Sequence, residues 1–162
     1  MLERALLDKS NNQIFSNGKI SADILVVCDD LDEKAKKDRV PFAGKNLKML
    51  ENMFLAIDID IKDIAIICID LTKNIHDYKI LINNIPHHFE EVLSRHIKII
   101  NPSILINMLT IYKNPNFEFN LLSKKLKTFH ISNPRLIIDD HNLKRDAWEK
   151  LKLLRENLDE KL

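Results

Sequence analysis

The chain has 162 residues, enough for one domain with a buried core, and its 25 basic residues nearly cancel 24 acidic ones, leaving a net charge of +1. This balance excludes strong whole-molecule attraction to a polyanion, so binding to a nucleic acid would need a local basic patch. Only two glycines occur, Gly18 and Gly44, which excludes the glycine-rich loops that cradle nucleotide phosphates.

Residues 1–22 are expected to form an N-terminal helix and loop ahead of the main domain. Residues 1–7 predict a short helix, and residues 10–21 predict a loop because they contain Asn-Asn and Asn-Gly pairs. Acidic side chains interrupt the apolar residues at the start, unlike a signal peptide, and no apolar run reaches the ~18 residues of a membrane span. We therefore expect a cytoplasmic protein without a membrane partner.

Four short apolar runs predict buried strands, at residues 24–28, 64–69, 103–108 and 125–131. Because their apolar residues are continuous rather than alternating, these strands are expected to be covered on both faces. The secondary structure of residues 74–86 is ambiguous from the sequence, and residues 78–82 are one candidate for a short edge strand.

Apolar residues at spacings of three and four predict amphipathic helices over residues 47–57, 89–100 and 143–158. The charged stretch 29–40 indicates a solvated loop or a short exposed helix. His96 and Trp148 lie on or beside the helical stripes and are expected to pack in the core.

The alternation of strands and helices predicts the fold class. We expect an α/β domain over residues 23–162, a three-layer α/β/α sandwich around a central, mainly parallel four-stranded sheet. In such sheets ligands bind at the carboxyl ends of the strands. The candidate site is therefore formed by the loops that begin at Asp29, Asp70, Leu109 and Ser132.

Metal-binding and disulfide chemistry are not expected. Cys28 and Cys68 lie inside apolar runs, which is typical of buried thiols in a cytoplasmic protein. A cluster of histidines and glutamates has no recognised ligand spacing and indicates a solvated helix start, at His87, His88, Glu90 and Glu91.

Two sequence elements resemble the family 4 uracil-DNA glycosylases. Residues 40–44 read Val-Pro-Phe-Ala-Gly, similar to the family's Arg-Pro-Phe-Val-Gly, and leucines at helical spacing follow in both. Residues 143–148 read Leu-Lys-Arg-Asp-Ala-Trp, similar to the family's Leu-Lys-Arg-x-Ala-Trp. The resemblance covers most of residues 24–154. It implies an enzyme fold that extrudes uracil from DNA and cleaves its glycosidic bond.

The resemblance implies roles for five positions of this chain. Phe42 stands where the family stacks an aromatic ring on the base, and Asp29 stands where a glutamate helps to position water. Cys68 replaces the asparagine that reads the base edge, and Asn133 replaces the histidine that stabilises the leaving uracil. Arg135 stands where the family inserts a loop into DNA. A thiol cannot make the paired contacts of an amide, and an asparagine cannot carry a positive charge.

Two further features of the family, its catalytic histidine and its iron–sulfur cluster, have no direct counterpart in this chain. His130 lies three residues before Asn133 and is a candidate substitute for the catalytic histidine. In the family four cysteines hold the cluster, whereas two of those positions fall on Thr72 and Phe89 here. We therefore expect no cofactor.

Each of these residues also has a structural interpretation, and the sequence leaves it open. Phe42 could be a loop aromatic packed on the core, and Asp29 could cap a turn or helix. His130 could be a hydrogen-bonded histidine of its strand, and Arg135 could be a surface arginine.

Three functions follow from these interpretations. The first is a domain of the uracil-DNA glycosylase superfamily, related to DNA repair by descent, in which base excision is weakened or lost and DNA binding is weak. The second is an active glycosylase with altered motifs that excises uracil or another damaged base. The third is a structural protein-interaction domain, whose partner the sequence does not identify. We expect a monomer.

Overall fold

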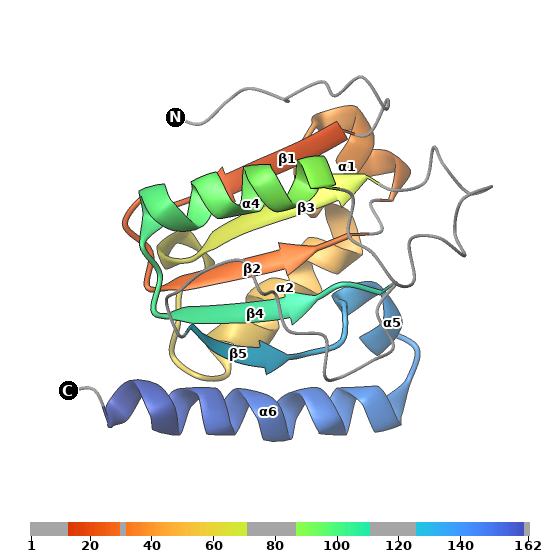
Figure 1. Ribbon diagram of the computed structural model, residues 1–162. Coiled ribbons are helices and arrows are strands. Elements are labelled where there is room, and N and C mark those ends of the chain that lie inside the picture. Colours follow the sequence, from red (N-terminus) through yellow and green to blue (C-terminus); the bar gives the residue numbers. More distant parts are fainter. Residues whose placement is uncertain (1–12, 30–31, 71–86, 111–125, 161–162) are drawn as a thin grey trace.

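The computed structural model describes residues 13–29, 32–70, 87–110 and 126–160, which form a sheet with helices on both faces (Figure 1). Within these ranges the sheet has five strands in the order β1-β3-β2-β4-β5. The strands are β1 (Gln13–Gly18), β2 (Ile24–Cys28), β3 (Ala65–Asp70), β4 (Ile104–Met108) and β5 (Lys127–His130). β1 is antiparallel to β3, and all other neighbouring pairs are parallel.

The four strands predicted from apolar runs are confirmed as β2, β3, β4 and β5. The predicted burial of β5 is wrong, because β5 lies at the edge of the sheet, where Lys127 and Thr128 are exposed and Phe129 and His130 are half-buried. These four strands form the parallel part of the sheet, with β2 and β4 paired at its centre. Every residue of β2 and β4 is buried, as their continuous apolar sequences predict for strands covered on both faces. The suggested edge strand at 78–82 lies outside the described residues.

β1 corrects the prediction of a four-stranded sheet and of a loop over residues 10–21. Residues 13–18 pair with β3 along its whole length, from Gln13 opposite Asp70 to Gly18 opposite Ala65. The polar sequence of β1 concealed this strand, because an edge strand is held by backbone hydrogen bonds and needs no continuous apolar run. The sheet is therefore mixed and five-stranded in the described part of the chain.

Three of the described helices follow the predicted apolar stripes, whereas two short helices, over residues 33–38 and 134–137, lie outside them. The described helices are α1 (Glu33–Asp38), α2 (Gly44–Leu55), α4 (His87–Ile100), α5 (Pro134–Ile137) and α6 (His141–Asp159), with a 3₁₀ turn over Ile61–Asp63. The charged stretch after β2 contains the short helix α1, which begins after Asp32. The Asp32 carboxylate accepts the backbone N–H of Ala35 at 2.7 Å and the side-chain amide of Asn46 at 3.0 Å. Asp32 is thus the N-cap of α1 and also ties that helix to the start of α2.

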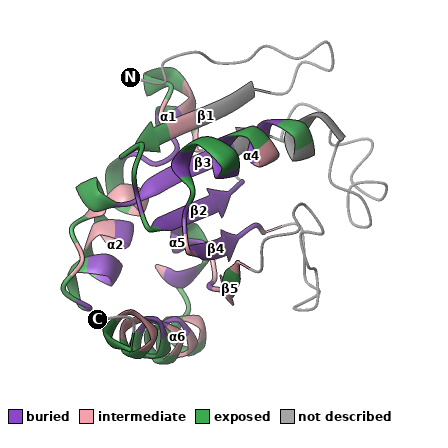
Figure 2. Cartoon of the chain, turned by 60° about the vertical axis from the view of Figure 1, so that its left-hand side comes forward, coloured by how far each residue is buried: buried purple, intermediate pink, exposed green. Residues whose placement is uncertain are grey.

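Two hydrophobic cores lie on opposite faces of the sheet. Alternate residues of β2 point to opposite faces, so that Val26 packs in the core with α2 and α6 and Leu25 packs in the core with α4. Figure 2 shows the buried residues in purple along β2 and β4, between these layers of helices. None of the described helices combines the length and hydrophobicity that crossing a membrane requires.

Gly18 makes the turn between β1 and β2 possible. Its φ of 106° lies in a region that side chains rarely adopt, and a Cβ at this position would overlap the carbonyl oxygen of Ile64. The neighbouring Lys19 N–H donates a hydrogen bond of 3.2 Å to that same carbonyl. The Asn-Gly turn predicted from the sequence is therefore a point of close approach between β1 and the start of β3.

Candidate functional site

The carboxyl ends of β2 and β4 meet where the chain changes faces of the sheet. After β2 the chain passes through α1 and α2 on one face, whereas it enters β4 from α4 on the other face. β2 and β4 are direct neighbours, with Cys28 opposite Met108 at the last paired position. In open α/β sheets, ligand sites form at such switch points. Three of the four buried polar residues in the described chain cluster near it, namely Asp29, Asn107 and Asn133.

Asp29 links the ends of three strands. Its carboxylate accepts the backbone N–H of Thr110, just after β4, at 2.7 Å. Its backbone carbonyl accepts the side-chain amide of Asn133, after β5, at 3.1 Å. The structure thus brings together Asp29 and Asn133, two of the residues that the sequence singled out. Both are only 2% exposed.

Asn133 is the N-cap of α5. Its Oδ1 accepts the backbone N–H of Arg135 at 3.0 Å, while Pro134 occupies the first turn of the helix, where its missing N–H costs nothing. Its Nδ2 makes the bond to the Asp29 carbonyl. Both ends of this carboxamide are therefore engaged by the chain's own backbone. Arg135, two residues further along the chain, is exposed.

Asn107 was not singled out from the sequence, although a signal was present. It is the one polar residue in the apolar run of β4, and a lone polar side chain within a buried strand requires a partner. Its Oδ1 accepts the backbone N–H of Leu109 at 3.0 Å, which shapes the end of the strand. His130 of β5 is its register partner, so the two side chains share a face of the sheet.

His130 is half-buried at the end of β5. Burial of its ring, and then the positive charge of Lys150, lower the pKa of His130 from its ordinary value of 6.5. The neutral imidazole is therefore favoured at neutral pH. A neutral ring can donate one hydrogen bond, but it lacks the positive charge that best stabilises a leaving anion.

Cys68 lies in the core rather than at an open surface. Cys68 and Cys28 are opposite each other on β3 and β2, neither is part of a disulfide, and both are fully buried. This confirms the prediction of buried thiols without a disulfide. The Cys28 Sγ lies 3.6 Å from the carbonyl oxygen of Ile67, within reach of a weak S–H hydrogen bond.

Phe42 packs against the core on the face of α2. Its side chain is 7% exposed and borders an open cavity of about 660 Å³ together with Gly18, Ile64 and Ile66. Asp29, Cys68 and Asn133 are absent from the described residues that line this cavity. The cavity beside Phe42 therefore lies between the segment that carries α1 and α2 and the side of the sheet that carries β1 and β3.

Two of the loops expected at the site, after β3 and after β4, continue into residues 71–86 and 111–125, outside the described part of the chain. Thr72, one of the positions aligned with the cluster cysteines, lies there as well. Within the described residues, no three histidine, cysteine, aspartate or glutamate side chains gather in a way that could hold a metal ion.

No protein-family model matches the chain, and a search of curated proteins finds no significant match. The resemblance to the family 4 uracil-DNA glycosylases thus rests on the sequence motifs alone, and the functional conclusion drawn from it is a proposal.

Proposed function

We propose that the chain is a domain of the uracil-DNA glycosylase superfamily, related to DNA repair by descent, in which base excision is weakened or lost and weak DNA binding remains. The motifs at residues 40–44 and 143–148 support the relationship. The four parallel strands with helices on both faces are consistent with the expected architecture.

The observation that carries the proposal is the engagement of Asp29 and Asn133 by the backbone. A carboxylate that positions water must offer an oxygen to that water, and a group that stabilises a leaving anion must point a donor at it. Here Asp29 accepts the Thr110 N–H, and the Asn133 amide donates to the Asp29 carbonyl, with both residues almost fully buried. These groups stabilise the loops in this arrangement and are poorly placed to meet a substrate.

The other aligned positions support the same proposal. Cys68 is fully buried and offers only a thiol where the family reads the base with an amide. Phe42 exposes little of its ring, whereas stacking on an extruded base requires an accessible face. Removing a single stabiliser of the leaving group typically costs about 10²–10³ in rate, so several simultaneous changes leave little activity.

Weak DNA binding depends on the loop after β5. Arg135 is exposed on the first turn of α5, at the position that the resemblance places in DNA. An arginine there can contact a phosphate or a base step. With a net charge of only +1, we expect binding that moderate salt abolishes.

The test combines excision with retention on DNA. The pure protein is incubated with uracil-containing single- and double-stranded DNA, and we expect no more abasic sites than in buffer. We expect the protein to be retained on single-stranded DNA at low salt. Arg135→Ala should weaken this retention, whereas the matched control Arg95→Ala, at another exposed arginine, should not. Abasic sites well above the buffer control contradict the loss of excision. Absence of retention at every salt concentration contradicts the DNA-binding part and favours a structural partner domain.

A further inference from the structure

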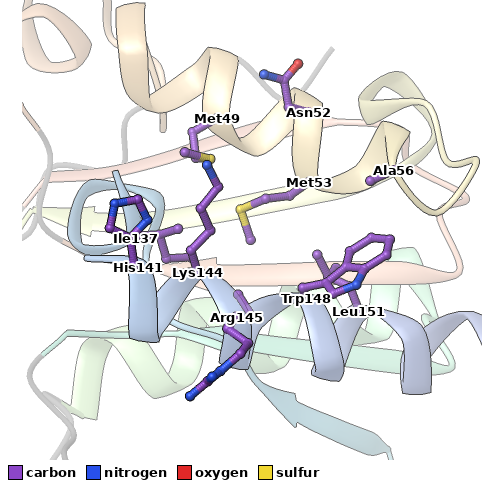
Figure 3. A pocket seen from close by; sticks show the side chains of 11 residues that line it. Met49, Asn52, Met53, Ala56, Ile137, His141, Lys144, Arg145, Trp148 and Leu151 are labelled. Atoms are coloured by element: carbon purple, nitrogen blue, oxygen red, sulfur yellow. The ribbon is translucent and has the colours of Figure 1, made fainter. Parts of the chain in front are cut away.

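A second cavity, of about 410 Å³, opens between α2 and α6 (Figure 3). Apolar side chains from both helices form most of its wall, including Met49 and Met53 from α2 and Ala147, Trp148 and Leu151 from α6. Its volume falls within the range of sites for small organic ligands, and methionine side chains adapt readily to ligand shape. The cavity is separate from Asp29, Asn107 and Asn133, none of which belongs to its described lining.

Trp148 is the large aromatic residue of this cavity, and it is 42% exposed. The prediction that it packs in the core was wrong, because the buried stripe of α6 runs through Ala147, Leu151 and Leu154, and Trp148 lies about 100° around the helix from Ala147. In Figure 3 the Trp148 ring lies beside Leu151, at the same end of the cavity as Ala56. A ligand in the cavity would cover apolar ring surface that water now contacts.

The ionisable residues that line this cavity are all basic, namely His141, Lys144 and Arg145. Figure 3 shows the Lys144 side chain extending from α6 between Met49 and Met53, while the Arg145 guanidinium points away from α2. Among the described residues, no ion pair of Lys144 or His141 occurs; the pairs on α6 are instead Lys150 with Asp146 and Arg155 with Asp159. The cation at the end of Lys144 is thus available to an anion bound in the cavity.

We propose that this cavity binds a small organic acid with an apolar body, an alkyl or aryl carboxylate. The apolar body lies against Met53 and Trp148, and the carboxylate pairs with the ammonium group of Lys144. This site goes beyond the proposed function and does not depend on it. Four residues of the segment 143–148 line the cavity.

Trp148 is the only tryptophan of the chain, so intrinsic tryptophan fluorescence reports directly from the cavity. The probe is decanoate, titrated into the pure protein, and its comparison is decyltrimethylammonium, which carries the same alkyl chain and the opposite charge. We expect decanoate to change the fluorescence in a saturable way. Decyltrimethylammonium should bind at least about tenfold more weakly, because its positive charge is repelled by Lys144 where the carboxylate of decanoate is attracted.

Three variants locate the binding. Lys144→Gln is expected to weaken decanoate binding about two- to fivefold, the effect of removing one ion pair at an exposed lysine. Lys152→Gln is the matched control, because Lys152 lies 5.8 Å from the Trp148 ring centroid but does not line the cavity. Ala56→Phe places a ring at the Ala56 end of the cavity from an exposed position and is expected to abolish binding while the circular dichroism spectrum is unchanged.

Several outcomes overturn the proposal. They are the absence of a saturable response to decanoate, equal binding of the anion and the cation, and unchanged decanoate binding in Ala56→Phe. A fluorescence change of Trp148 that appears without decanoate as the protein concentration rises also overturns the proposal. Such a change indicates that a second copy of the chain covers the cavity.

Discussion

Replacing Asn133 by alanine tests whether this residue stabilises the fold. The substitution removes the cap of α5, worth about 1 kcal/mol. It also removes the side-chain amide that donates to the buried Asp29 carbonyl, and loss of a donor to a buried acceptor costs about 1–3 kcal/mol. We therefore expect Asn133→Ala to lower the free energy of unfolding by about 2–4 kcal/mol.

Asn133→Ser separates the two hydrogen bonds. Serine keeps an acceptor for the Arg135 N–H, but its shorter side chain does not reach the Asp29 carbonyl. We expect it to lose only the second contribution, about 1–3 kcal/mol. Asn142→Ala, at an exposed position in the first turn of α6, is the matched control and should change stability by less than about 0.5 kcal/mol.

The assay is urea denaturation followed by circular dichroism. With a slope of about 2 kcal/mol per molar urea, Asn133→Ala shifts the midpoint downward by about 1–2 M. A midpoint that moves no further than that of Asn142→Ala would refute the structural role of Asn133. The engagement of its carboxamide would then no longer argue against a catalytic role.

Three further predictions use the same assay. Gly18→Ala should destabilise the fold by at least about 2 kcal/mol, because Cβ meets backbone at a positive φ; an unchanged midpoint contradicts this turn geometry. Asp32→Ala should cost about 1–2 kcal/mol through loss of the α1 cap, whereas Asp32→Asn keeps an acceptor and should cost less; equal losses argue against the cap. Because the folded chain lowers the pKa of His130, the unfolded chain binds its proton more tightly, and stability falls as pH drops below 6.5 toward the folded-state pKa. His130→Gln should therefore flatten the dependence of unfolding free energy on pH between about 7 and 5, and a slope equal to that of the unsubstituted chain contradicts the shift.

The parallel part of the fold was predictable because burial leaves a strong sequence signal. The short, mainly apolar runs of β2 and β4 predicted strands covered on both faces, and the stripe of α6 marked its buried side. β1 was not predictable in this way, because pairing of an edge strand depends on a free neighbouring edge, here that of β3.

The candidate site was predictable in part. The rule for carboxyl ends of parallel strands pointed to Asp29 and to the loop after β5, where Asn133 lies, and the structure places these residues in contact. Which atoms are engaged could not be read from the sequence, since the bond joins an amide to a backbone carbonyl 104 residues away. Asn107 could have been found, because it interrupts an apolar strand.

The exposure of Trp148 could not be predicted from the apolar stripe of α6. A residue one position from the centre of a stripe is buried only if a neighbouring element covers that side of the helix. Between α2 and α6 the described chain leaves a cavity instead, and the sequence of α6 alone contains no information about the distance to α2.

We infer that Asp29 and Asn133 stabilise the fold and do not take part in base excision. The most direct measurement is uracil release with the protein in excess over a uracil-containing single-stranded oligonucleotide, followed by cleavage at abasic sites. We predict a rate equal to that of buffer, for the unsubstituted chain and for Asp29→Asn alike. Release above buffer that Asp29→Asn abolishes would contradict the account and identify the chain as a working glycosylase.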